Sequence, residues 1–470
     1  MAGRPRTVKH PNELLHYWLG RAGVSNAELA REVTRRARAL GERGINPSEG
    51  RVRAWRGGET PRHPVPQIIA DFLADRTGLP LNCADIGLPD RTTPVTAGPD
   101  LSWKPAAAIA AIAHLTRSEI MVSHSRDSVD ARSVHTGHDL LDPLQHWTTA
   151  SPSALTARGG GRLGASDING IRAVTDMFRD ADNRHGGALS RKAVIAQMSD
   201  ANALLSTASY DEATGRALFA AVADLGSVAG WMTFDVGLHK QAQHIFFAAL
   251  HAASEAGDKV LGAHILQCMA RQMSHLKHYD EALDLVNLAQ YGARRHATPA
   301  TRSMLAALEA RFHAILGQVT ESERAAGTAE ELFAAVDQDN EPAHMAFFDE
   351  AELCATIGVA HQIAAKHDAG PGRAVRAENS VRLLGRALEL RPEHRVRSAA
   401  FDHVGLARTH LAVGEVDGAL TEARRALHIF RSLGSPRVGD RLIELQQEAA
   451  PFEASRAGGE LRDVLSEALG

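Results

Sequence analysis

The side chains best suited to chemistry in this 470-residue sequence are arginines close to its start. Residues 48 to 56 read Ser-Glu-Gly-Arg-Val-Arg-Ala-Trp-Arg, and the serine is placed to cap a short helix. Val52 and Trp55 stand three residues apart and should face inward, which turns the arginines outward. An outward arginine can donate two hydrogen bonds to guanine or bind phosphate. The side chains that we expect to contact nucleic acid are Ser48, Glu49, Arg51, Arg53, Arg56, Arg62 and Arg35.

The distribution of charge supports this expectation. Residues 1 to 78 hold 14 Lys and Arg against 8 Asp and Glu, although the whole chain carries a net charge of −4. A basic N-terminal segment on an acidic remainder predicts that the segment meets a polyanion. The alternative is a small structural domain in which the arginines of residues 35 to 43 only form a solvated helix face.

Four short helices should position these arginines, over residues 11 to 21, from residue 26, over 49 to 56 and over 65 to 76. Ser25, with Glu28 three residues on, is the N-cap expected for the second helix. Residues 27 to 31 (Ala-Glu-Leu-Ala-Arg) and 52 to 57 (Val-Arg-Ala-Trp-Arg-Gly) resemble the helix-turn-helix domain of the Cro and lambda-repressor type. The resemblance implies that the third helix enters the major groove of double-stranded DNA. The segment from 34 to 47 is longer than the tight turn of that family.

A second pattern recurs further along the chain at intervals of 40 residues, with Gly230, Ala270 and Ala310 in equivalent places. Small residues there, and at Ala242, let two helices of a hairpin approach closely. A large residue such as Phe246 then fills the space between successive hairpins. This spacing resembles the tetratricopeptide repeat, whose usual period is ~34 residues. Five such hairpins are expected.

The predicted fold is therefore all-α, with a small helix-turn-helix domain followed by a tetratricopeptide-like α-solenoid. The last segment should be a polar cap with Glu444 and Glu448 on exposed faces. The expected boundaries are 1–88 for the DNA-binding domain, 89–105 for a linker, 106–165 for a helical connecting region, 166–435 for the repeats and 436–470 for the capping helices.

A wider resemblance comes from residues 182 to 187 (Asp-Asn-Arg-His-Gly-Gly) and 229 to 232 (Ala-Gly-Trp-Met). They are similar to a family of actinobacterial, Streptomyces-type cytoplasmic regulators with an N-terminal helix-turn-helix and a tetratricopeptide body. The resemblance implies transcription regulation, in a family associated with sporulation and antibiotic production.

The inner groove of the solenoid is the expected ligand site, because first helices of successive hairpins line the concave side. Such a groove can hold an extended peptide, a small molecule or a partner protein by hydrogen bonds and charge. For any one of these side chains, the alternative is that it only solvates the face. The groove residues that we expect are Asp224, Ser227, Trp231, Asp235, Gln267, Arg271, Arg311 and His361.

The sequence offers no support for an enzyme. The glycines of residues 159 to 164 lack the Lys-Ser or Lys-Thr pair of a phosphate loop, and no nucleophile motif is present. His135 and His138 lack further spaced ligands, so neither a metal site nor a cofactor is expected. Three distant cysteines fit a reducing cytoplasm, and no apolar run is long enough for a membrane span.

Two functions remain open. The first is a DNA-binding regulator whose repeat body forms a homodimer and senses an effector, since a single short recognition helix reads few bases. The second is an adaptor that does not bind DNA and holds a partner protein in the solenoid groove.

Overall fold

The computed structural model describes residues 11–39, 42, 44–62, 64–77, 81, 83, 85–88, 103–122, 134–153, 156–157, 160–433 and 435–469. These residues form twenty α-helices, three short 3-10 helices and two isolated β-bridges, without a β-strand. The predicted all-α fold class is confirmed. The chain divides into two compact units, Met1–Val95 and Thr96–Gly470. Most of the expected linker at 89–105 lies outside the described residues.

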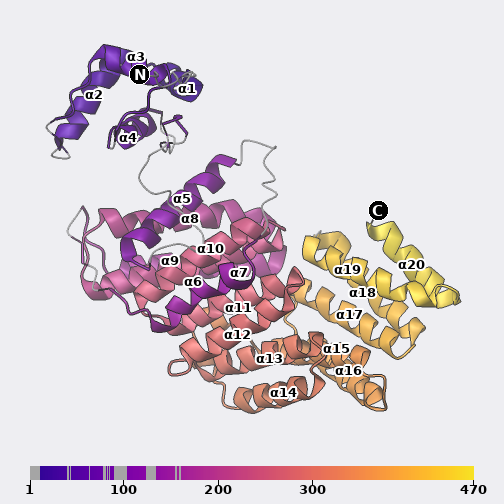
Figure 1. Ribbon diagram of the computed structural model, residues 1–470. Coiled ribbons are helices and arrows are strands. Elements are labelled where there is room, and N and C mark those ends of the chain that lie inside the picture. Colours follow the sequence, from indigo (N-terminus) through magenta and orange to yellow (C-terminus); the bar gives the residue numbers. More distant parts are fainter. Residues whose placement is uncertain are drawn as a thin grey trace, which may run out of the picture. The chain divides into compact units, whose positions relative to one another are not determined.

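The first unit contains α1 (Glu13–Ala22), α2 (Asn26–Ala39), α3 (Glu49–Arg56) and α4 (Val65–Thr77) (Figure 1). Its core consists mainly of aliphatic side chains from all four helices. The fully or almost fully buried ones include Leu15, Leu29, Val33, Val52, Trp55, Ile69 and Leu73. The unit thus buries one stripe of each helix and leaves the opposite stripes in solvent.

The side chains of Ser25 and Ser48 were expected to cap two helices of the first unit. The Oγ of Ser25 accepts a hydrogen bond from the backbone N–H of Glu28 at 3.1 Å, as an N-cap should. Ser48 precedes α3 but its side chain forms no capping bond; only its carbonyl accepts, from the N–H groups of Arg51 and Val52. The expected side-chain cap of the third helix is therefore absent, and the serine hydroxyl stays exposed.

The second unit is a series of antiparallel helical hairpins (Figure 1). They follow two helices, α5 (Pro105–Val122) and α6 (Gly137–Thr149). The hairpins are α7 (Ala165–His185) with α8 (Gly187–Thr207), α9 (Glu212–Asp235) with α10 (His239–Ala256), α11 (Lys259–His275) with α12 (Tyr279–Ala293), α13 (Pro299–Ile315) with α14 (Val319–Phe333), α15 (Glu350–His367) with α16 (Gly372–Leu390), α17 (Val396–Ala412) with α18 (Val416–Leu433), and α19 (Pro436–Ala449) with α20 (Arg456–Leu469).

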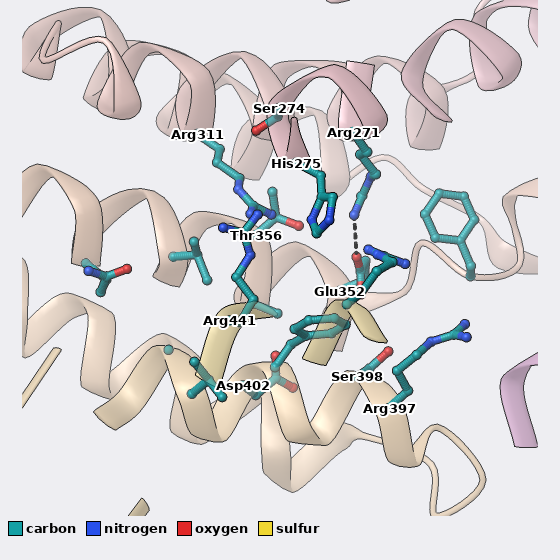
Figure 2. A pocket seen from close by; sticks show the side chains of 18 of the residues that line it. Arg271, Ser274, His275, Arg311, Glu352, Thr356, Arg397, Ser398, Asp402 and Arg441 are labelled. Carbon is teal, nitrogen blue, oxygen red and sulfur yellow. Dashed lines mark hydrogen bonds and ion pairs between the residues drawn. The ribbon is translucent and has the colours of Figure 1, made fainter. Parts of the chain in front are cut away.

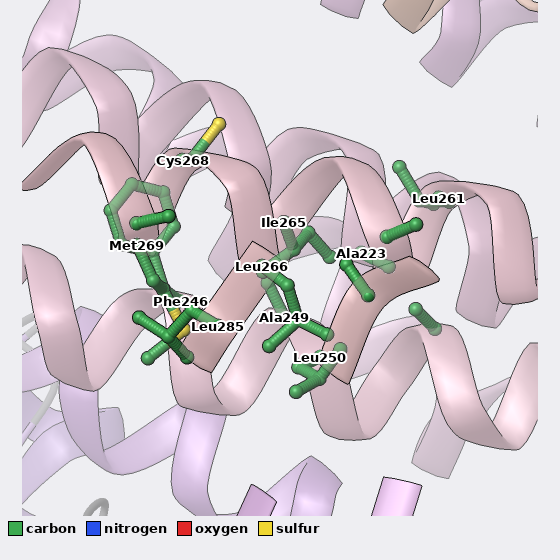
Figure 3. Packing of buried hydrophobic residues seen from close by; sticks show 14 of the residues in the cluster. Ala223, Phe246, Ala249, Leu250, Leu261, Ile265, Leu266, Cys268, Met269 and Leu285 are labelled. Atoms are coloured by element: carbon green, nitrogen blue, oxygen red, sulfur yellow. The ribbon is translucent and has the colours of Figure 1, made fainter. Parts of the chain in front are cut away.

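Small residues hold the hairpins together as the 40-residue pattern predicts. A Cβ atom added to Gly230 on α9 would lie 2.5 Å from the ring of Phe246 on α10. Figure 3 shows Phe246 and Ala249 of α10 packed among Ile265 and Leu285 of the next hairpin. The close approach of α9 and α10 therefore depends on the missing side chain at residue 230.

The connecting region belongs to the same compact unit as the repeats. Helix α5 packs on α8 and α10, and α6 packs on α12. The fully buried ring of Trp147 on α6 packs directly against Gly262 of α11. A Cβ atom added to this glycine would lie 2.5 Å from Nε1 of the tryptophan ring. Helix α6 thereby covers the outside of the hairpin formed by α11 and α12.

Helix α9 is the one helix of the described segments that is long and apolar enough to cross a membrane. However, 78% of its apolar window is buried inside the second unit. Its hydrophobicity is therefore accounted for by its place in the core, between α8 and α10.

We predict that Gly230→Ala destabilises the protein by about 1–3 kcal/mol, because the new methyl group must displace the buried ring of Phe246. The matched control is Gly385→Ala on α16, where an added Cβ meets nothing within 4 Å. That change should stabilise the helix by about 1 kcal/mol. Denaturant unfolding measures both, and equal effects would contradict the packing argument.

A second prediction concerns His251, which is 2% exposed and stacks on Trp103 with ring centroids 3.7 Å apart. Burial, aided by nearby His146, lowers the pKa of His251 to about 3. Below pH ~6.5 the unfolded chain takes up a proton that the folded chain does not, so stability falls as the pH drops. His251→Phe should reduce the loss of stability between pH 7 and 5 by about 2 kcal/mol. The control, exposed His138→Gln, should leave that loss unchanged in thermal unfolding curves at both pH values.

Candidate functional site

Two arginines of the first unit project from α3 into solvent. Val52 and Trp55 anchor the helix in the core, while Arg51 and Arg53 are exposed. Arg51 pairs with Glu59 at 3.0 Å and Arg53 with Glu49 at 3.5 Å. Exposed ion pairs of this kind contribute little to stability, so the guanidinium groups can exchange these partners for a ligand.

The other arginines that were expected to contact nucleic acid differ in their exposure and in their partners. Arg62 is exposed. Arg35 is also exposed but donates to the carboxylate of Glu32 on its own helix, at 2.9 Å through Nε. Arg56 is half-buried and donates to Asn26 Oδ1 at 2.9 Å, so it fastens α3 to the start of α2. Its expected outward orientation is not what the structure shows.

The second unit contains an open cavity of about 1320 Å³. Its walls come mainly from α7, α9, α11, α13, α15, α17 and α19, the first helices of the successive hairpins. Of the expected groove residues, the structure brings five together on these walls: Ser227, Trp231, Gln267, Arg271 and Arg311. Most of the groove residues suggested by the sequence therefore line one cavity.

The remaining three expected residues do not line the cavity. Asp224 and Asp235 lie behind the wall and hold arginines that do line it, Arg179 and Arg397 respectively. His361 is half-buried on α15 and lies outside the set of lining residues. The two aspartates thus shape the cavity indirectly.

Buried ion pairs join the two ends of the second unit. Arg397 on α17 donates to Asp182 on α7 at 2.9 Å and to Asp235 on α9 at 2.7 Å. Arg437 on α19 reaches the other oxygen of Asp235 at 3.2 Å. Although burial opposes it, Arg397 and Arg437 hold the pKa of Asp235 below its usual value. We call this group, Asp182, Asp235, Arg397 and Arg437, the closing network.

The guanidinium of Arg437 also lies against aromatic rings. It is 4.4 Å from the ring centroid of Phe234, 4.9 Å from that of Trp231 and 5.4 Å from that of Phe401. Such contacts favour a cation. Trp231, which was expected in the groove, therefore also contacts Arg437 and helps to hold α19 in place.

Helix α19 is thus a cavity wall, and its Glu444 and Glu448 do not lie on exposed faces as expected. Glu444 and Glu448 are half-buried and accept hydrogen bonds from Arg408 of α17, at 3.2 and 2.6 Å. Arg441 of the same helix donates to Glu444 at 2.7 Å and also lines the cavity.

A further cluster of buried charges joins α11, α15 and α17. Arg391 bonds Glu352 at 2.9 Å and Asp402 at 2.8 Å, and Arg271 pairs with Glu352 at 3.3 Å. Burial raises the pKa of Asp402 to about 6 even against the pull of Arg391. Burial also opposes ionisation of Glu352, but Arg391 and Arg271 together keep its pKa below the usual value.

The cavity walls carry twelve Lys or Arg but only seven Asp or Glu, so the space is suited to an anion. Arg311 has no hydrogen bond or ion pair to any described residue, and its buried Nε has no partner. Burial, with nearby Arg441 and Arg271, lowers the pKa of Arg311 to about 9. Figure 2 shows Arg311 and Arg441 pointing toward one another from α13 and α19.

Burial also shifts the pKa values of a cysteine and two histidines of the cavity. Burial raises the pKa of Cys268 to about 12, so its thiol stays protonated. The nearby rings of His264 and His344 lie 5.1 Å apart, and burial lowers both of their pKa values. Within the described part of the chain, no group of three or more His, Cys, Asp or Glu side chains could hold a metal ion.

Comparison with known proteins adds one finding. Residues 15–89 match the family model of the SP15 N-terminal domain. The match begins in α1 and ends just past residues 86–88, whose backbone carbonyls at Ile86 and Gly87 accept hydrogen bonds from Asn12. It therefore covers the first unit and none of the helical hairpins. No curated protein matches the chain.

We predict that Arg397→Met destabilises the second unit by about 3–5 kcal/mol, because it leaves Asp182 as an unpaired buried charge. The control is Arg373→Met, which also lines the cavity but is exposed and bonds only the carbonyl of Asp368. It should change the unfolding free energy by less than about 0.5 kcal/mol. Similar losses in both variants, measured by denaturant unfolding, would show that the closing network adds nothing.

Proposed function

We propose that this protein is a DNA-binding transcription regulator: its first unit reads duplex DNA, and its repeat body dimerises and binds an effector. The observation that carries the proposal is the arrangement of α3. One side of that helix is locked into the core by Val52 and Trp55, and the other presents Arg51 and Arg53 to solvent. A short, firmly packed helix with exposed guanidinium groups is suited to recognition in a major groove.

The surroundings of α3 support the same proposal. Helices α2 and α3 pack against each other, in the order of the helix-turn-helix resemblance. The exposed hydroxyl of Ser48 and the exposed Arg62 flank the arginines of α3. In the proposed complex Arg51 and Arg53 contact bases, whereas Arg56 holds the helix in place through Asn26. Arg35 and Arg62 are assigned to phosphates.

The repeat body supplies the regulatory part of the proposal. The resemblance to actinobacterial regulators of sporulation and antibiotic production suggests a one-component system, in which ligand binding alters a dimer. A ligand has this effect only if it binds one arrangement of the body more tightly than another. The positively charged cavity of the second unit is a suitable place for that ligand.

The proposal predicts the behaviour of the full chain on labelled genomic DNA fragments. Affinity should fall steeply with added salt, because phosphate contacts release counterions. Arg51→Ala combined with Arg53→Ala should weaken the preferred fragment by about tenfold or more and remove the preference among fragments. Fluorescence anisotropy at several salt concentrations measures both effects.

The matched control is Arg216→Ala on α9. Like Arg53, this arginine is exposed and pairs with a glutamate four residues earlier, but it belongs to the second unit. DNA affinity should stay unchanged in the control. Binding that is weak, independent of salt and equal in all three proteins would refute DNA reading and favour the adaptor that uses the solenoid cavity.

A further inference from the structure

The arginines of the cavity fall into two groups. Most are held by carboxylates: each of the following has at least one such partner, namely Arg179, Arg271, Arg391, Arg395, Arg397, Arg408, Arg437 and Arg441. Two cations without a carboxylate partner among the described residues, Lys277 and Arg373, are exposed to solvent. Arg311 is the exception, since it has no partner and is half-buried.

The surroundings of Arg311 disfavour its positive charge. Of the charges that act on it, those of Arg441 and Arg271 have the largest effects and are positive, whereas the effect of the Glu352 carboxylate is smaller and opposite. Three arginines that line the cavity each have a buried N–H group without a hydrogen-bond partner among the described residues, at Arg311 Nε, Arg271 Nη2 and Arg437 Nε. Guanidinium N–H groups of this kind can donate to the oxygens of an anion.

We propose that the cavity binds a small organic oxyanion, whose phosphate or carboxylate group is held by Arg311 and Arg441 and is reached by Arg271. Guanidinium groups suit this role because their N–H donors match the two oxygens of such a group in a planar fork. The buried hydroxyl of Thr356 lines the same space and can donate a further hydrogen bond (Figure 2).

The size and lining of the cavity indicate the rest of the ligand. About 1320 Å³ is far more than an inorganic anion fills. Apolar side chains line it beside the arginines, among them Phe312, Ile315, Val359 and Phe401. The ligand should therefore carry an apolar or aromatic body next to its oxyanion. This inference rests on the proposed role of the repeat body as an effector receptor, but not on DNA binding by the first unit.

The test is calorimetric titration of the full chain with pyrophosphate and, separately, with citrate, as phosphate and carboxylate probes. We expect saturable binding of at least one probe in the millimolar range or tighter. Arg311→Gln should weaken it by about tenfold or more, and Arg441→Gln should weaken it as well. The stronger probe identifies the chemical class of the oxyanion.

Two controls separate this site from other positive surfaces. Arg302→Gln lies on the same helix, α13, but its exposed side chain points away from the cavity lining, so binding should change by less than about twofold. The Arg51→Ala and Arg53→Ala double variant should also bind the probe normally, which makes the outcome independent of the DNA experiment.

Stability provides a second readout. In the absence of any probe, Arg311→Gln should melt at the same temperature as the wild type or higher, because it removes a crowded charge without a partner. The probe should raise the melting temperature of the wild type but not of this variant. Absence of binding by both probes, or an equal loss of binding in Arg302→Gln and Arg311→Gln, would overturn the proposal.

Discussion

The architecture of the second unit depends on the closing network, in which two aspartates near the start of the hairpins bind two arginines near their end. A series of stacked hairpins has contacts mainly between neighbours, and nothing in that stacking requires its ends to meet. Here Arg397 bridges α7 and α9 to α17, and Arg437 adds α19. A buried charge that loses its partner is strongly unfavourable, so loss of Arg397 would leave Asp182 unpaired inside the unit.

Contact between the two ends of the hairpin series forms the cavity, and ion pairs of the same kind determine its charge. Carboxylates behind and within the walls neutralise most of the arginines and fix their positions. They leave Arg311 without an acceptor, next to Arg441 and Arg271. The structure thus separates arginines that build the walls from an arginine that is available to a ligand. Because Arg441 lies on α19, together with Arg437 of the closing network, a ligand bound there is linked physically to closure.

In the first unit, side-chain contacts must likewise hold a short helix, α3, in one orientation. A helix of eight residues has few contacts with which to hold its orientation. Val52 and Trp55 provide an apolar anchor, and Arg56 adds a polar one through Asn26. The two arginines between these anchors can then remain in solvent without loss of order. Arginines close together in sequence therefore have different surroundings: Arg56 holds α3 to α2, whereas Arg51 and Arg53 are exposed.

Much of this molecule follows from local sequence patterns. The 40-residue recurrence of small residues marks the hairpins, since a small residue such as Gly230 lets two helices approach closely. Ser25 marks the start of α2, because a cap acts over three residues of chain. The inward stripe of α3 follows from helical periodicity. The first helices of the hairpins could also be assigned to the concave wall, and five of the eight expected groove residues line the cavity.

Other features were decided only by tertiary contacts. Nothing near Arg397 in the sequence indicates that its partner is Asp182, 215 residues away, because pairing at that range depends on how the curvature of all intervening hairpins adds up. Arg56 was expected outward, and its contact with Asn26 depends on the angle at which α3 packs on α2. Helix α19 has the polarity of a terminal cap, but its charges are paired with α17 and α9 across the cavity. The sequence by itself determined the helices and their apolar faces, since these arise from short-range periodicity. Only the folded structure decided which charges meet, since that depends on distances between residues far apart in the chain.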